Sequence, residues 1–180
     1  MKKLSLLSRG VTLVEMLIVV GILGVILAVA APSLADMMAK RRVEMVAAEL
    51  ATSLAYARSE AGSRPSSVLV FFGGGGSCYS LVYWGGGGAC NCALGAGNAC
   101  SDPDASGTEI KTVAVPSSTG VTLSYTNAVV TFVSPSMTVT PANPSITVSN
   151  RVGQIRVSLN AVGRISSCSP DGSISGYVRC

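Results

Sequence analysis

Residues 11–31 read VTLVEMLIVVGILGVILAVAA, and this stretch decides the fold. A run of about 21 mostly apolar residues has the length that crosses the hydrocarbon core of a bilayer as a helix. A short basic segment, MKKLSLLSRG at residues 1–10, precedes it. The Lys/Arg bias of this segment places the N-terminus in the cytoplasm and the following chain across the membrane.

The overall composition agrees with a chain that is only partly in contact with water. Hydrophobic residues make up 48% of the 180 residues and charged residues only 12%, against about 25% charged in ordinary soluble domains. Three of the cations behind the net charge of +4 are Lys2, Lys3 and Arg9. From Val11 onward ten Lys/Arg face nine Asp/Glu, a balance of +1 that argues against a broad phosphate-binding surface. The chain has no His, which excludes a Ser-His-Asp triad and a His metal site.

A conventional secretory signal is the alternative interpretation of the apolar run, with residues 28–31 (AVAA) as its cleavage site. Glu15 argues against it. A charged side chain inside a membrane segment costs roughly 2.5–3.5 kcal/mol on insertion scales, and nothing in the function of a discarded signal requires such a residue. A carboxylate that pairs with a cation inside a membrane assembly would explain why the residue is present.

The helical pattern also continues beyond the apolar run. Apolar residues recur at spacings of three and four, which indicates one buried stripe of an amphipathic helix: Val43, Val46, Ala47, Leu50, Leu54 and Ala57. Gly62 and Pro65 are expected to end this helix. The two segments together predict one helix of about 50 residues, roughly 75 Å long, with a kink or local unwinding at Pro32, Gly21 or Gly24.

The stretch from Gly10 to Glu15, GVTLVE, resembles the processing motif of type IV prepilins. The resemblance implies that a dedicated prepilin peptidase cuts after Gly10 and methylates the new N-terminus at Val11. It makes Glu15 the assembly residue and Pro32 the helix-bending proline. The family usually has Phe where this chain has Val11.

A second resemblance covers residues 47–70, AAELATSLAYARSEAGSRPSSVLV, which are similar to the FimT/GspH family of minor pilins and type II secretion pseudopilins. It implies a structural subunit of a type IV pilus or a type II secretion pseudopilus, with no catalytic residues and no cofactor. The implied partners are other pilin or pseudopilin subunits, the prepilin peptidase and the inner membrane. The implied location is the bacterial inner membrane, with the C-terminal domain in the periplasm, and then the filament.

These inferences divide the chain into a leader (1–10), a transmembrane segment (11–31), an amphipathic continuation (32–62) and an exported β-rich domain (63–180). In that domain, short runs rich in Val and Thr are bounded by Gly, Pro, Ser or Asn, which is typical of strands: 67–72, 78–84, 109–115, 121–125, 129–133, 145–149, 154–159 and a weaker 163–167. Pro135, Pro141 and Pro144 favour edge strands around them. The predicted fold class is α+β, a long N-terminal helix packed against antiparallel sheets as in pilins.

Six cysteines lie beyond residue 77: Cys78, Cys90, Cys92, Cys100, Cys168 and Cys180. An exported domain favours disulfides, and Cys168 with Cys180 is the clearest pair because it closes a C-terminal loop. The other four allow three connectivities, and four thiolates binding zinc is the alternative, although the usual spacing is missing. The runs Gly73–Gly76 and Gly85–Gly88 lack the Lys of a phosphate loop and are expected to be flexible connections.

A basic cluster near the C-terminus is the candidate DNA contact. Arg151, Arg156, Arg164 and Arg179 are opposed there only by Asp171. Some FimT-like proteins bind DNA through a C-terminal G-R-x-R motif, and Gly163-Arg164 matches its first half while the second Arg is missing. The resemblance therefore keeps open a DNA-binding minor pilin for DNA uptake, with Arg164, Arg156 and Arg179 as contacts. Solvated strand charges are the simpler interpretation.

Overall fold

The computed structural model describes residues 11–86, 89–102 and 106–180, and only the backbone of Pro32. Helix α1 (Leu13–Ser63) is continuous over its 51 residues. It passes through Gly21, Gly24 and Pro32 without interruption, so the local unwinding expected there is not observed, and a bend at Pro32 stays a prediction. The chain divides into two compact units, one ending at Met38 and the other spanning Ala39–Cys180.

The first unit contains the apolar half of α1. All of its described side chains from Val11 to Met38 are exposed, including Leu13 at 77% and Val29 at 74% of their surface. A helix that is apolar all round and has no protein neighbours needs lipid or other subunits around it.

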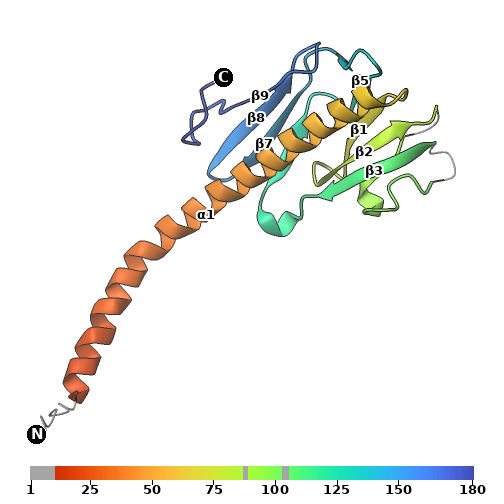
Figure 1. Ribbon diagram of the computed structural model, residues 1–180. Helices are drawn as coiled ribbons and strands as arrows, with labels where there is room; N and C mark the ends of the chain where they lie inside the picture. Colours follow the sequence, from red (N-terminus) through yellow and green to blue (C-terminus); the bar gives the residue numbers. More distant parts are fainter. Residues whose placement is uncertain (1–10, 87–88, 103–105) are drawn as a thin grey trace, which may run out of the picture. The chain divides into compact units, whose positions relative to one another are not determined.

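The second unit places the remainder of α1 against two antiparallel sheets (Figure 1). The first sheet has the strand order β3-β2-β1-β5-β6 and the second has the order β4-β7-β8-β9. The strand bounds are β1 (Val68–Gly73), β2 (Cys78–Trp84), β3 (Gly107–Ala114), β4 (Thr122–Tyr125), β5 (Val129–Val133), β6 (Thr138–Thr140), β7 (Ser145–Asn150), β8 (Gly153–Leu159) and β9 (Ile165–Cys168).

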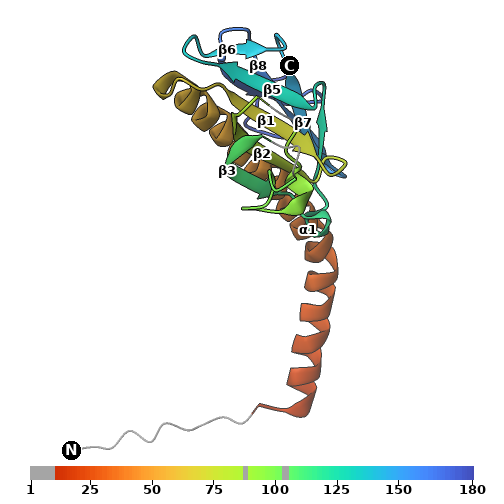
Figure 2. The same cartoon turned by 90° about the vertical axis from the view of Figure 1, so that its right-hand side faces the viewer.

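The second half of α1 lies against the sheets in both ribbon views (Figures 1 and 2). One hydrophobic core joins this part of the helix to both sheets. The helix contributes a stripe at spacings of four and three, with every member at most 1% exposed: Val43, Ala47, Leu50, Leu54, Ala57 and Ala61. Phe132 of the first sheet and Ile155 of the second belong to the same core. The predicted stripe is therefore the buried face of the helix, with Val46 partly buried at its margin.

A smaller core covers the opposite face of the first sheet. Alternate residues of a strand point to opposite faces. Val70 and Phe72 of β1 belong to the helix core, whereas Phe71 packs with Val82 and Cys90 in a second cluster. The cysteine loop between β2 and β3 thus lies on the face of the sheet that the helix leaves uncovered.

The predicted strands agree with the structure except around the prolines. Strands β2 and β5 have the predicted bounds, and the others differ at their ends by one to two residues. The expectation of edge strands is wrong for β5 and β7, which both lie inside their sheets. Strand β6, which was not predicted, takes the edge beside β5. Pro144 stands just before β7 and therefore removes no N–H from its ladder.

Candidate functional site

The start of α1 carries the residues assigned to processing and assembly. Gly10 and the rest of the leader lie outside the described residues. Val11 is 59% exposed and precedes the helix. The N–H of Glu15 donates a hydrogen bond to Thr12 Oγ1, at 3.2 Å. Thr12 therefore caps the helix three residues ahead of a Glu, which is the sequence pattern of a capping box. The sequence reasoning missed this cap, although Thr-x-x-Glu was readable.

The exposed apolar surface around Glu15 determines what that residue can do. The helix is long and apolar enough to cross a membrane, by length and composition. Glu15 itself is exposed on it. A carboxylate in an apolar medium is tolerated when it finds a cation or a hydrogen-bond donor. The Thr12 cap engages the backbone N–H of Glu15 and not its carboxylate.

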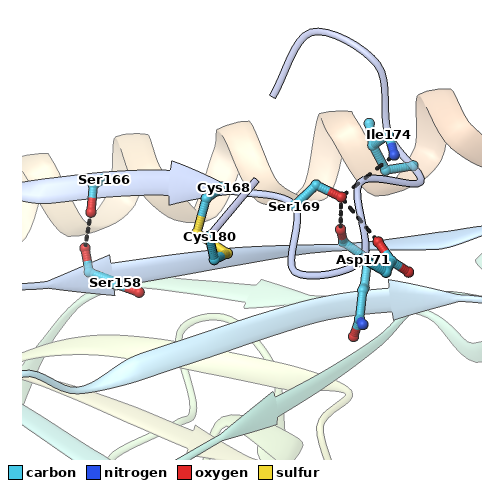
Figure 3. The surroundings of a disulfide bond; sticks show 8 residues. Ser158, Ser166, Cys168, Ser169, Asp171, Ile174 and Cys180 are labelled. Atoms are coloured by element: carbon cyan, nitrogen blue, oxygen red, sulfur yellow. Dashed lines mark hydrogen bonds between the residues drawn. A yellow bond between two sulfur atoms is a disulfide. The ribbon is translucent and has the colours of Figure 1, made fainter. Parts of the chain in front are cut away.

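The C-terminal loop is closed by a disulfide between Cys168 and Cys180 (Figure 3). This is the pair expected from the loop's composition. Ser169 follows the first cysteine and is fully buried, and its N–H donates to the carbonyl of Val178, at 2.9 Å. The loop is thus held by backbone hydrogen bonds as well as by the covalent link.

Asp171 organises the inside of the same loop (Figure 3). Its Oδ1 accepts hydrogen bonds from the hydroxyl of Ser173 at 2.6 Å and from the N–H of Ser173 at 3.0 Å. The Ser169 hydroxyl lies 3.0 Å from the same oxygen. These hydrogen bonds, those from Ser173 first, lower the pKa of Asp171 to about 2.

The other four cysteines form two interleaved bridges, Cys78–Cys92 and Cys90–Cys100. No cysteine of the chain is free, so none of them is a thiolate ligand here. Over residues 11–86, 89–102 and 106–180 no group of three or more His, Cys, Asp or Glu side chains is arranged to hold a metal.

Glu109 of β3 anchors the second of these bridges to the sheet. Its two carboxylate oxygens accept hydrogen bonds from the N–H of Gly97 at 2.8 Å and of Ala99 at 2.9 Å. Partial burial acts to raise the pKa of Glu109, but the hydrogen bonds outweigh it and the net pKa is lowered. The carboxylate therefore stays ionised and holds the loop against β3.

The end of α1 is fixed to the sheet by a second carboxylate. The Tyr83 hydroxyl donates a hydrogen bond to Glu60, and this bond is the main cause of the lowered pKa of Glu60. Arg64 Nε lies 3.1 Å from the same oxygen of Glu60. The Arg64 guanidinium also sits 4.9 Å from the centre of the Tyr83 ring. Glu60 and Arg64 are therefore both engaged within the chain.

The three arginines suggested as DNA contacts lie at two places on the second sheet. Arg156 of β8 pairs with Cys168 of β9, and Arg179 directly precedes the partner of Cys168 in the C-terminal disulfide. Arg164 lies in the turn between β8 and β9, at the other end of β9. Arg164 and Arg179 are exposed and Arg156 is half-buried. The structure thus separates Arg164 from the other two, and it brings Gly163 against Arg58 of α1, a contact that the sequence did not indicate.

Two family models match the chain. The model for type II transport protein GspH matches residues 46–163, which is more than half of the chain. The model for the prokaryotic N-terminal methylation motif matches residues 7–31. The apolar helix and this motif fit a membrane-anchored subunit of a pilus or pseudopilus. No curated protein sequence matches the chain significantly.

Solved structures of pilins and pseudopilins share the fold. The minor pilin FimU of Pseudomonas aeruginosa has 18% identity and a TM-score of 0.52, over 70% of this chain and 87% of that one. In another crystal form FimU gives a TM-score of 0.50, over 69% and 90%. The minor pseudopilin EpsH of the type 2 secretion system of Vibrio cholerae has 11% identity and a TM-score of 0.52, over 72% and 98%.

The helix, the two sheets and the N-terminal motif agree with these matches, and the predicted α+β pilin-like fold is confirmed. Proteins of this kind are structural subunits that assemble with other pilin subunits, and they are not enzymes. The chain belongs to the GspH family of type II transport proteins, the minor pilins and pseudopilins.

Proposed function

We propose that this chain is a minor pilin or pseudopilin that is cut after Gly10 by the prepilin peptidase and methylated at Val11. Residues 11–31 then hold it in the bacterial inner membrane, with the domain from residue 63 onward in the periplasm. Glu15 draws the subunit into the filament by pairing with the N-terminal amine of a neighbour. The amphipathic continuation at residues 32–62 joins the membrane segment to the β domain.

The observation that carries the proposal is the apolar half of α1, whose described side chains are all exposed. It coincides with the match to the N-terminal methylation motif over residues 7–31. A membrane shields such a surface before assembly and neighbouring helices shield it afterwards. Within that apolar setting Glu15 favours a positively charged partner, and a new amine at Val11 of the next subunit supplies the charge.

Mass spectrometry of the mature N-terminus tests the processing step. In cells that contain the peptidase, the protein should begin at Val11 and carry one added methyl group. A matched Gly10→Val variant should keep its leader. A mature N-terminus near Pro32 would mean ordinary signal cleavage and would refute the proposal.

The choice between a type IV pilus and a type II secretion pseudopilus is tested by deletion of the chain. A pilus subunit should be needed for surface filaments or for functions that depend on them. A pseudopilus subunit should be needed for the release of secreted proteins, with surface filaments unchanged.

DNA binding for DNA uptake is the second candidate. The disulfide Cys168–Cys180 favours it, because it fixes Arg179 close to the β9 residue that pairs with Arg156. Arg164 at the far end of β9 would add one more phosphate contact.

A further inference from the structure

A cavity of about 350 Å³ lies between α1 and the β8–β9 turn. Its walls come from Ala55 and Arg58 of the helix, from Met137 ahead of β6, and from residues 163–165. Two sequence motifs from opposite ends of the domain meet here, the Ala-Arg-Ser-Glu-Ala run around Arg58 and the Gly-Arg pair at Gly163.

Arg58 has an unsatisfied donor at this cavity. Its Nε atom is buried and has no hydrogen-bond partner among the described residues. A buried donor without an acceptor is costly, and more so when it belongs to a charged group. An acceptor in the cavity would pair with the terminal N–H groups of the Arg58 guanidinium, and would reach Nε only if the side chain moved.

Gly163 leaves the room for this guanidinium. Its φ of +76° is a conformation that favours glycine. A Cβ built on it would lie 2.9 Å from Arg58 Nε and 2.7 Å from the carbonyl oxygen of Met137. Any side chain at position 163 would therefore press on Arg58 and close this end of the cavity.

The cavity is positively charged and uncompensated. Arg58 and the exposed Arg164 both line it, and no Asp or Glu is among the described residues around it. The acid nearest in sequence to Arg58 is Glu60, which is engaged by Tyr83 and Arg64. Two arginines therefore line one space, and no acidic residue is among its described lining residues.

Guanidinium groups bind carboxylates and phosphates in planar, bidentate geometry. The residues that line this cavity favour a carboxylate over a phosphate. Ala55, Met137 and Ile165 supply apolar surface, which suits a carboxylate carried on a short aliphatic stem. A nucleic-acid backbone needs a wide basic surface to track its phosphates, and this domain is nearly neutral.

We propose that the cavity receives the carboxylate of an Asp or Glu side chain from another subunit of the filament, paired with Arg58 and Arg164. The proposal rests on assembly with other subunits, as argued above, and adds where and by which chemistry one of them is held. Arginine is among the residues that most often anchor protein interfaces from well-packed pockets.

The first experiment measures binding chemistry in the full chain, purified in detergent micelles. The ¹⁵N-labelled Nε–H resonances of Arg58 and Arg164 are followed during titration with N-acetyl-glutamate methylamide. The neutral glutamine analogue, inorganic phosphate and a short DNA duplex are titrated at the same ionic strength. The acid should give saturable shifts at both arginines, whereas the neutral analogue should give none.

Matched variants locate the site. Arg164→Gln changes an exposed residue and should weaken binding roughly tenfold, the effect of losing one charge-assisted contact. Arg58→Lys keeps the positive charge but loses the planar pair of N–H donors that binds a carboxylate at two points, and it should also weaken binding. Arg156→Gln removes the same charge on β8 and should leave binding unchanged. If phosphate or the duplex binds through Arg58 as tightly as the acid does, the proposal is overturned.

The second experiment identifies the partner. A photo-crosslinking amino acid at Ser59, which lines the cavity, should join this chain to another subunit in isolated filaments. Arg164→Gln should reduce that product roughly tenfold, and Arg156→Gln should not. Filaments that contain the chain but yield no such product would refute the subunit contact. If the chain never enters filaments, the proposed function fails, while the micelle titration still decides whether the cavity takes a carboxylate.

Discussion

Single carboxylates fix two loops of this domain. Glu109 holds the loop of the Cys90–Cys100 bridge through two backbone N–H groups, and Asp171 holds the C-terminal loop through Ser173 and Ser169. Both act as anions that accept hydrogen bonds from residues of the loop that each one holds. Their effect on structure should therefore depend on their ionisation.

The Asp171 interactions should be lost in acid. Its pKa is lowered to about 2 in the folded chain, whereas a free Asp titrates near about 4. A lowered folded value means that the contribution is complete above about pH 4 and disappears as the pH falls towards 2. NMR titration of the Asp171 carboxyl carbon should give a midpoint near 2, and the Ser173 amide should shift with it.

The matched control is Asp171→Asn, in which the Ser173 amide should no longer report that transition. Asp102→Asn, at an exposed aspartate of the other loop, should leave it in place. A midpoint near 4 in the unmodified protein would contradict the hydrogen-bonded arrangement.

Glu15 has two roles to separate, a local one and one between subunits. Glu15→Gln keeps a side chain that suits a capping box but removes the charge. Incorporation into filaments should fall roughly tenfold, the ratio that about 1.4 kcal/mol produces. Thr12→Ala removes the cap, at a cost of about 1 kcal/mol of helix stability, and keeps the charge.

Quantifying each variant in purified filaments, relative to its amount in the membrane, tells the roles apart. Thr12→Ala should assemble nearly as well as the unmodified chain. Equal incorporation of Glu15→Gln would show that pairing with a neighbour's amine does not drive assembly.

At the residue scale the sequence indicated which local hydrogen bonds a residue can make better than it indicated contacts between distant residues. Thr12 and Glu15 are three residues apart, so their cap could be predicted from the local sequence. The contact of Arg58 with Gly163 could not be predicted, because these residues are more than a hundred positions apart and meet only when the β8–β9 turn packs against the helix. No local pattern encodes that distance.

At the scale of elements, the second half of α1 is held by its buried stripe. Leu50 is fully buried, and replacing it by Ala should cost about 2–5 kcal/mol through lost transfer energy and a residual cavity. Met45 lies on the same helix and is 64% exposed. Met45→Ala should change stability by less than about 0.5 kcal/mol.

Urea unfolding of the fragment Ala39–Cys180 measures both variants, with the bridges intact. The difference between their free energies of unfolding is the quantity of interest. Comparable losses would mean that the helix is not packed in the register described here.

The elements themselves were largely open to prediction because they follow local periodicity. The helix stripe repeats every three to four residues, and β2 and β5 are short, mostly apolar runs that end close to Gly, Ser or Asn. Strand β6 was not predicted because it has only three residues, between Pro135 and Pro141, which are too few to show an alternating pattern. The pairing of Cys78, Cys90, Cys92 and Cys100 escaped because three connectivities satisfy the same spacing.

At the scale of the whole molecule, charge sets the limits of the DNA candidate. The chain after Gly10 has one net positive charge, so binding depends on the C-terminal arginines: Arg151, Arg156, Arg164 and Arg179. Three or four phosphate contacts give a slope of log K against log salt of about −3 to −4. Affinity should be weak and should vanish at moderate salt.

Titration of residues 36–180 with a short duplex at several salt concentrations provides the measurement. Arg164→Gln should weaken binding and flatten the slope by about one. Glu49→Gln, which removes an exposed negative charge elsewhere, should not flatten it. A domain that binds no duplex even at low salt would exclude DNA uptake through this subunit.

The interleaved bridges give the cysteine loop a tolerance to cleavage. Since Cys78 joins Cys92 and Cys90 joins Cys100, any single cut between Cys78 and Cys100 leaves the two products covalently attached. Even a pair of cuts, one on each side of the segment 90–92, releases nothing, because that segment carries one half of each bridge. A subunit that a protease nicks here can therefore keep this loop, with fragments that separate only after reduction.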